Sequence, residues 1–310
     1  MASSIEARDP FTVRGLVAVV TGGGIGIGLM IARALEANGA IVYVIGRRKE
    51  VLDNAASTTV RTAPSVTQVH SSLAIFAHKV LTIAETRQHT RDRGGRDEQG
   101  DLSRAAGHLK ARHGYVNVVV ANSGVAGPSI SGFPQDASLS EFRSHLWGWD
   151  SDAFTDTYAV NTTAVFSTLV AFLELLDESN KRGNLGQRSQ FIATSSIGAY
   201  NRTCLSGYAY DSSKAAVVHM VKQLPTGLVP YGIRANVIAP GLYPSEMTGY
   251  HIDMGEKDGW SKQFITEQRP GSIQDIAGVI LFLTSKAGAY VNGNVLLTEG
   301  GRLGIIPSTY

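Results

Sequence analysis

The chain has 310 residues, of which 43% are hydrophobic, so it can enclose a large core, and a single α/β domain is the expected organisation. Its 28 Lys and Arg nearly balance its 26 Asp and Glu, and a net charge of +2 gives no reason to expect nucleic acid or an acidic membrane as a partner. The only cysteine, Cys204, excludes an intrachain disulfide and fits a reducing compartment.

No segment of the sequence has the pattern of a targeting or membrane signal. The start, 1–12, carries charged residues and lacks the apolar run of a signal peptide. No stretch approaches the roughly 18 uncharged apolar residues of a spanning helix. The terminal Ser308-Thr309-Tyr310 matches no retrieval or peroxisomal signal. We therefore expect a cytoplasmic protein without a membrane partner.

Short apolar runs alternate with longer helical patterns along the chain, which is typical of βαβ units. In chain order, the expected strands are 16–20, 41–45, 116–121, 190–194, 234–239 and 294–298. The expected helices are 27–37, 50–56, 153–176, 208–228 and 275–284. Right-handed crossovers between parallel strands predict one doubly wound, Rossmann-type sheet of about seven strands with helices on both faces.

The segment between Thr58 and Asp101 departs from this spacing. We expect a third strand there and little else, although the segment has about 30 residues more than the spacing of the other units needs. The residues Leu73, Phe76, Val80 and Leu81 have the spacing of one amphipathic helix face. The charged, glycine-containing run 87–100 is expected to be a solvated loop. We interpret 58–100 as an atypical insertion in a single domain that spans 1–310.

A glycine-rich run lies directly between the first expected strand and the first expected helix. Its sequence is Thr21-Gly22-Gly23-Gly24-Ile25-Gly26-Ile27-Gly28. Glycines permit a tight turn and close approach to a pyrophosphate, whose charge is attracted by the positive end of the helix. A structural turn is the alternative, but this position after a buried strand favours a dinucleotide-binding loop. The expected contacts are Thr21, Gly22, Gly24, Ile25, Gly26, Ile27 and Gly28.

The second expected strand ends in Ile45-Gly46-Arg47-Arg48-Lys49. A carboxylate at this place would accept the ribose 2′-hydroxyl of NAD, whereas this chain has three cations. Because a guanidinium binds phosphate through a bidentate fork, Arg47 and Arg48 are predicted to bind the 2′-phosphate of NADP. NAD is the less favoured cofactor, and an ordinary exposed basic surface is the alternative interpretation.

Tyr210 and Lys214 stand four residues apart in an expected helix, so they share one face. A phenol with its ordinary pKa of about 10 is a poor acid or base at neutral pH. A nearby ammonium favours the phenolate and lowers that pKa. The spacing arises often by chance, so its meaning depends on which other polar groups converge on the pair.

Ser196 supplies such a group, because it follows the expected strand 190–194 and ligands of open α/β sheets bind at the carboxyl ends of strands. Its hydroxyl can donate to a carbonyl oxygen as negative charge develops there. No Gly-x-Ser-x-Gly elbow surrounds it, so a nucleophilic triad is not expected. Asn161, inside the long helix, is a further polar candidate.

Together these motifs resemble the short-chain dehydrogenase/reductase family over nearly the whole chain. The matching positions are the glycine-rich run, Asn122-Ser123-Gly124, Asn161, Ser196, Tyr210, Lys214, the segment 236–241 and Glu299-Gly300-Gly301. The resemblance implies a catalytic tetrad of Asn161, Ser196, Tyr210 and Lys214. It also implies cofactor contacts from Asn122, Gly124, Tyr210, Lys214, Pro240 and Gly241, with Ile238 packing against the nicotinamide.

In the scheme that the resemblance implies, hydride passes from the nicotinamide to a carbonyl carbon. Tyr210 supplies the proton and Ser196 polarises the oxygen. Lys214 lowers the pKa of Tyr210 and binds the nicotinamide ribose, and Asn161 helps to hold a water that connects Lys214 to solvent. No metal is required, and no His/Cys/Asp spacing suggests one. A homodimer or homotetramer is the implied assembly.

Some residues depart from the family pattern. The family places an Asp just after the third strand to contact the adenine, whereas 66–73 contains no acid. Pro225 lies late in the helix that carries Tyr210, where an interior proline kinks the helix. His219 is expected on the surface, and Tyr208 has no lysine four residues after it.

The segment 242–264, after the Pro240-Gly241 turn, is expected to form a substrate lid. Its large side chains suggest a small to medium apolar or aromatic ketone or aldehyde, and they are Tyr243, Met247, Tyr250, Met254 and Trp260. We therefore expect an NADP-dependent carbonyl reductase. The alternatives are a reductase of 3-oxoacyl thioesters and a non-catalytic NADP-binding regulator or scaffold.

Overall fold

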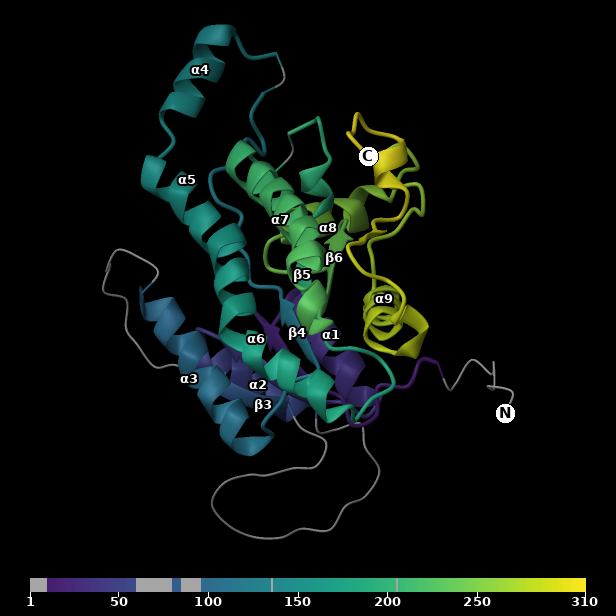
Figure 1. The fold of residues 1–310 in the computed structure, drawn as a ribbon. Coiled ribbons are helices and arrows are strands. Elements are labelled where there is room, and N and C mark those ends of the chain that lie inside the picture. The colour runs from purple at the N-terminus through teal and green to yellow at the C-terminus, as the bar shows by residue number, and fades with distance from the viewer. Residues whose placement is uncertain (1–9, 60–79, 85–95, 135, 205) are drawn as a thin grey trace.

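The structure is a computed structural model that describes residues 10–59, 80–84, 96–134, 136–204 and 206–310 (Figure 1). Seven parallel strands form one sheet in the order β3-β2-β1-β4-β5-β6-β7, as the crossover argument predicts. The strands are β1 (Val17–Thr21), β2 (Ile41–Gly46), β3 (Val80–Ala84), β4 (Val118–Ala121), β5 (Gln190–Thr194), β6 (Arg234–Pro240) and β7 (Val295–Thr298).

The helices alternate with these strands along the chain. They are α1 (Gly26–Ala37), α2 (Lys49–Thr59), α3 (Arg96–Arg112), α4 (Leu139–Trp147), α5 (Ser151–Tyr158), α6 (Ala164–Arg182), α7 (Tyr208–Gly227), α8 (Gly249–Asp258) and α9 (Ile273–Thr284). The order of strands reverses between β1 and β4, so the carboxyl ends of these two strands flank the crevice in which doubly wound sheets bind ligands.

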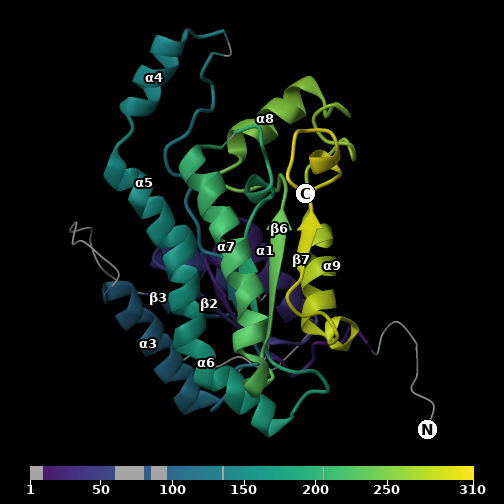
Figure 2. The same cartoon turned by 45° about the horizontal axis from the view of Figure 1, so that its top comes forward.

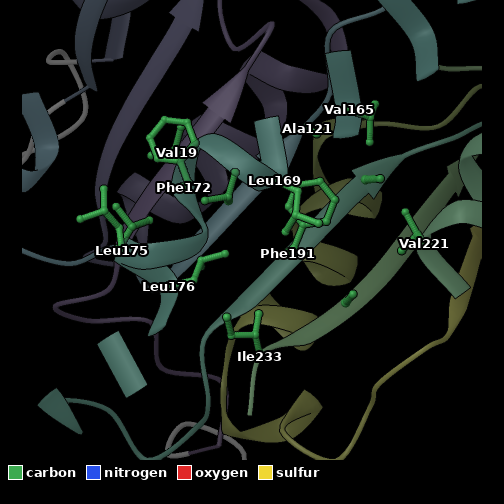
Figure 3. Packing of buried hydrophobic residues seen from close by; sticks show 14 of the residues in the cluster. Val19, Ala121, Val165, Leu169, Phe172, Leu175, Leu176, Phe191, Val221 and Ile233 are labelled. Carbon is green, nitrogen blue, oxygen red and sulfur yellow. The ribbon is translucent and has the colours of Figure 1, made fainter. Parts of the chain in front are cut away.

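Each face of the sheet carries its own hydrophobic core. Helices α3, α6 and α7 cover one face, and α1, α2 and α9 cover the other. Figure 3 shows part of the first core, to which Phe172 and Leu176 of α6 and Phe191 of β5 belong. All three side chains are fully buried, and burying a side chain of this size contributes about 1.5–3 kcal/mol. The two cores hold the strand ends that carry the site.

The third strand lies between Thr58 and Asp101, as predicted. It is β3, which pairs with β2 in parallel from Val42↔Val80 to Gly46↔Ala84. Val80 and Leu81 are therefore strand residues, and the predicted helix face that included them is wrong. The residues 66–73, which lack the acid that the family places after this strand, lie outside the described part of the chain, as does Glu85, the residue that follows β3 in the sequence.

The expected loop 87–100 is also wrong at its end, because α3 begins at Arg96. This helix has little apolar periodicity, but Leu102, Ala105 and Leu109 recur at helical spacing and are buried against α6. Two small apolar-poor helices, α4 and α8, likewise had no sequence prediction. None of their residues is buried, and α4 stands away from the sheet in both views (Figures 1 and 2).

The long helix predicted at 153–176 consists of α5, a π-helical turn at Ala159–Thr163 and α6. Of the described helices, this segment, Ser151–Arg182, is long and apolar enough to cross a membrane by length and composition alone, contrary to the sequence prediction. Core helices meet the same criterion. Its face with Leu169 and Phe172 is packed into the core of α3, α6 and α7.

Helix α7 continues past Pro225 to Gly227. Proline has no N–H to donate to the carbonyl of Val221, but helical bonding resumes where Leu228 N–H donates to the Leu224 carbonyl at 2.8 Å. The proline therefore costs a bond in the last turn without ending the helix. Tyr210 and Lys214 lie at the other end of α7, far from this defect.

Candidate active site

The glycine-rich loop joins β1 to α1 and leaves the start of the helix open. Gly22 and Gly26 have φ of +64° and +51°, a region that disfavours side chains. A Cβ at Gly28 would lie 2.2 Å from the Gly22 carbonyl oxygen, so the turn closes only around glycine. No side chain caps α1 at Ile25, and its first turn has no acid, so its N–H groups suit an anion such as a pyrophosphate.

Thr21 and Asn122 tie this loop to the carboxyl end of β4. Thr21 Oγ1 accepts the backbone N–H of Asn122 at 3.0 Å and of Ser123 at 3.3 Å. Asn122 Nδ2 donates to the Gly22 carbonyl at 3.5 Å. Thr21 is buried, so its side chain shapes the loop and has little surface to offer a ligand.

The three cations after β2 differ in their surroundings. Lys49 Nζ lies 2.5 Å from the Asp53 carboxylate, one turn along α2. Arg48 makes a bidentate pair with Glu246, from which its two terminal nitrogens each lie 3.0 Å. Arg47 is exposed and pairs with no acid among the described residues. Sequence reasoning missed Glu246, because it is 198 positions away from Arg48.

Ser196 and Tyr210 meet at the carboxyl end of β5, as predicted. The Ser196 hydroxyl acts on the Tyr210 phenol and opposes the rise of its pKa. Ser196 caps a short 3-10 turn, Ile197–Ala199, in which its Oγ accepts the Gly198 N–H at 3.0 Å. Because that bond fills an acceptor position, the hydroxyl proton is left to donate to an oxygen at Tyr210 or on a substrate.

Lys214 lies one helical turn beyond Tyr210 and is 3% exposed. Its Nζ is 5.7 Å from the centroid of the Tyr210 ring and donates to the Thr194 carbonyl at 3.1 Å. The main chain of Lys214 is held as well, because Ser195 Oγ donates to its carbonyl at 2.8 Å. The end of β5 therefore positions the ammonium, a contact that local sequence patterns do not reveal.

Asn161 is fully buried in the π-helical turn, and its side chain is occupied by the protein. Its Oδ1 accepts the Val125 N–H at 2.8 Å, and its Nδ2 donates to the Val125 carbonyl and to Ser213 Oγ, each at 3.0 Å. A Cβ on Gly124 would lie 3.3 Å from Asn161 Oδ1 and 3.4 Å from Lys214 Nζ. The amide thus fixes the loop beside Lys214.

Comparisons with known proteins identify the family. A family model described as "short chain dehydrogenase" matches residues 16–92, and one described as "Enoyl-(Acyl carrier protein) reductase" matches residues 96–302. The chain is 44% identical to the short-chain dehydrogenase/reductase PhomF of Diaporthe leptostromiformis over 310 residues, which cover 99% of this chain and 98% of that protein. This chain is a short-chain dehydrogenase/reductase.

Other relatives of this short-chain dehydrogenase/reductase extend the comparison. It is 37% identical to VdtF of Byssochlamys spectabilis over 99% of each chain. It is 29% identical to the rhamnolipids biosynthesis 3-oxoacyl-[acyl-carrier-protein] reductase of Pseudomonas aeruginosa, over 94% of this chain and 97% of that protein. Among solved structures, the Pseudomonas aeruginosa RhlG/NADP active-site complex has a TM-score of 0.73 at 27% identity, covering 94% of this chain and 98% of that one.

Burial governs both titrating groups of this dehydrogenase/reductase. It raises the pKa of Tyr210, an effect that the hydrogen bond from Ser196 opposes and the charge of Asp211 reinforces. Burial lowers the pKa of Lys214 to about 8. The prediction that Lys214 lowers the Tyr210 pKa is therefore wrong for the protein groups alone. Desolvation of the phenolate is the largest effect on this pKa, and the Lys214 ammonium lies 5.7 Å from the centroid of the ring.

Asp211, next to Tyr210, is a titrating residue that sequence reasoning missed. Burial raises its pKa from 3.8 to about 7, against the effect of a hydrogen bond with Cys204. Its Oδ1 has no hydrogen-bond partner among the described residues and lies where a Cβ on Gly198 would be. Burial and Asp211 together raise the pKa of the Cys204 thiol to about 11.

Asp211→Asn should remove a pH-dependent loss of stability. The folded carboxyl binds its proton more tightly than the unfolded one, so its stabilising contribution is complete below pH 3.8 and is lost as pH rises towards about 7. We expect the variant to be more stable than wild type by about 1–2 kcal/mol at about pH 8 and equal at about pH 4, allowing for partial exposure.

Urea unfolding at the two pH values measures this difference. Asp253→Asn makes the same change at an exposed position on α8 and serves as the control. Equal pH profiles for wild type and Asp211→Asn would contradict the assignment.

The structure also gives the positions of four further residues that the sequence analysis named. His219 lies on the exposed side of α7, as expected, and Tyr208 is exposed too. Ile238 is fully buried in the core with α1 and α9, so it offers no surface to a nicotinamide. Tyr243 is 2% exposed and hydrogen-bonds Thr298 at 2.5 Å, so it anchors the start of the lid instead of lining a substrate site.

Two further observations complete the site. Gly241 fits closely, because a Cβ there would lie 2.8 Å from Glu299 Cα, and its neighbour Pro240 ends β6 and is buried. Within the described part of the chain, no three His, Cys, Asp or Glu side chains group closely enough to hold a metal ion.

Proposed function

We propose that this short-chain dehydrogenase/reductase uses NADPH to reduce a ketone or aldehyde on a small to medium apolar or aromatic substrate, or oxidises the matching alcohol. The observation that carries the proposal is the convergence of Ser196, Tyr210 and Lys214 at the carboxyl end of β5. The open glycine-rich loop lies at the carboxyl end of β1, two strands away in the sheet, on the same edge.

When bound, the nicotinamide supplies or accepts the hydride at the carbonyl carbon. Ser196 donates its hydroxyl proton in a hydrogen bond to the carbonyl oxygen and stabilises the negative charge that develops there. Tyr210 transfers its phenolic proton to that oxygen, which yields the alcohol. The raised pKa of Tyr210 keeps the phenol protonated at neutral pH, which suits the direction of reduction.

Lys214 then acts on the phenolate that the transfer leaves. Its ammonium faces the ring of Tyr210 and is held by the Thr194 carbonyl, so a negative charge on the ring stabilises the charged lysine. Asn161 positions the Gly124–Val125 loop beside the ammonium. The cycle is complete when a proton returns to the Tyr210 phenolate by way of the Lys214 ammonium.

The basic residues after β2 support NADP over NAD. Arg47 is exposed and Arg48 lies in a pair between two exposed side chains, so both can turn to a 2′-phosphate. We expect the double substitution Arg47→Gln/Arg48→Gln to weaken NADPH binding about 10- to 100-fold, since hydrogen bonds to charged groups contribute about 1.5–3 kcal/mol. Fluorescence titration with NADPH and NADH measures it, and equal losses for both cofactors would contradict the assignment.

The apolar substrate is inferred from the lid. Met247, Tyr250 and Met254 recur at helical spacing and are 44%, 65% and 44% exposed. Figure 2 shows α8 at the end of the molecule towards which the arrows of β6 and β7 point. Large apolar side chains exposed beside a site are the surface that an apolar ligand would cover.

Reduction of a 3-oxoacyl thioester is the second candidate. It is supported by the 29% identity to the Pseudomonas aeruginosa 3-oxoacyl-[acyl-carrier-protein] reductase. A substrate panel with NADPH separates the candidates, because turnover of acyl-carrier thioesters without turnover of free ketones would favour the second. Cofactor binding with no turnover on the whole panel would instead support a non-catalytic regulator.

Assembly and location follow as lesser proposals. We infer a homodimer or homotetramer, because Phe166 and Val170 of α6 are 50% and 53% exposed on one helix face. Sedimentation equilibrium tests this assembly, and a monomer at micromolar concentration would refute it.

A cytoplasmic location remains our proposal from the single cysteine, and fractionation of cells that express the chain tests this location.

A further inference from the structure

An ion pair spans the mouth of the cofactor site. Arg48 follows β2, and Glu246 follows β6, which lies four strands away in the sheet order. Arg48 Nη1 donates to Glu246 Oε1 and Nη2 donates to Oε2, each at 3.0 Å, so the arrangement is a bidentate fork. The side chains are 55% and 63% exposed, so the pair lies at the surface.

The pair joins the lid to the glycine-rich loop. The lid turn, residues 245–248, is closed by a hydrogen bond of 2.9 Å between the hydroxyls of Ser245 and Thr248. A Cβ on Gly26 would lie 3.0 Å from Ser245 Cβ, so this turn rests directly on the loop. Helix α8 begins at Gly249, immediately after the turn, and has no buried residue of its own. The turn therefore leads directly into α8.

A 2′-phosphate at Arg48 would meet this carboxylate. The phosphate would carry a charge of about −1.5 to −2 and would need the same guanidinium edge that Glu246 occupies. Two anions on one edge repel each other. Because the Arg48–Glu246 pair is solvent-exposed and therefore weak, the more highly charged group displaces the carboxylate.

We propose that Glu246 competes with the cofactor's 2′-phosphate for Arg48. A 2′-phosphorylated dinucleotide then breaks the Arg48–Glu246 pair and releases the lid turn, whereas an unphosphorylated dinucleotide leaves the pair intact. This inference rests on the proposed NADP site after β2. It makes Glu246 a residue that tunes cofactor specificity, and it couples the identity of the cofactor to the freedom of the apolar lid.

A double-substitution cycle with NADPH and NADH as probes tests the competition. Glu246→Gln keeps the size of the side chain and removes its charge, and we expect it to tighten NADPH binding about two- to fivefold without changing NADH binding. In an Arg48→Gln background the same substitution should not change the affinity for NADPH, because Arg48, for which Glu246 and the phosphate compete, is absent. Glu256→Gln, on the exposed side of α8, removes the same charge elsewhere on the lid and should change neither cofactor.

The outcomes separate the inference from the proposed function. A wild-type enzyme that binds NADPH no more tightly than NADH would overturn both. Preference for NADPH together with equal tightening by Glu246→Gln in both backgrounds would overturn only the competition, because it would indicate a general effect of charge. No tightening at all would overturn it too.

Hydrogen exchange of residues 244–258 gives a second readout that does not depend on affinity. We expect NADPH to raise exchange of this segment in the wild type to the level of Glu246→Gln, and NADH to leave it unchanged. Equal responses to both cofactors would contradict the release of the lid.

Discussion

Tyr210→Phe is expected to lower kcat/KM for carbonyl reduction by about 100- to 10,000-fold, the usual contribution of a positioned general acid. The substitution removes the phenolic O–H beside Ser196, while the ring that faces Lys214 remains. Cofactor binding should therefore persist, since the glycine-rich loop is unchanged. Oxidation of NADPH, followed by absorbance with a carbonyl panel, measures turnover, and fluorescence titration measures binding.

Tyr208→Phe is the matched control for this prediction. It makes the same change two residues earlier on α7, at a ring that is 44% exposed and lies 6.1 Å from Trp149. We expect it to retain wild-type turnover. Retention of activity by Tyr210→Phe, or an equal loss in both variants, would refute the role assigned to Tyr210.

Gly28→Ala is expected to abolish cofactor binding at concentrations that saturate the wild type. The added Cβ would stand 2.2 Å from the Gly22 carbonyl oxygen and 2.5 Å from Asn122 Nδ2. Backbone must then shift, and the shift displaces the N–H groups that would face the pyrophosphate. Each lost hydrogen bond to a charged group weakens binding by about tenfold or more. Titration with NADPH, monitored by fluorescence, measures the loss.

Gly107→Ala provides the contrasting substitution. Gly107 lies in the interior of α3, is exposed and has nothing within 4 Å of an added Cβ. Alanine there should raise the free energy of unfolding by about 0.5–1 kcal/mol and leave cofactor binding unchanged. Wild-type NADPH affinity in Gly28→Ala would show that the loop does not hold the cofactor.

Sequence alone determined the features that depend on near neighbours. Strand β5 was predicted with its bounds as observed, and each end of α1, β2 and α7 was predicted to within one residue. Buried strands and amphipathic helices repeat their apolar residues locally, so the sequence shows them. The same holds for Tyr210 and Lys214, whose spacing of four places them on one helix face. Where local signals were weak, as for β3 and for the apolar-poor α3, prediction was wrong.

Only the tertiary structure decided which distant groups meet. The pairing of Arg48 with Glu246, the Thr194 carbonyl on Lys214 and the burial of Asp211 all depend on the order of strands in the sheet. Burial reversed the expected direction of the Tyr210 pKa, because desolvation depends on everything packed around the phenol. A periodic pattern specifies which face a residue occupies, but the partner on that face comes from another part of the chain.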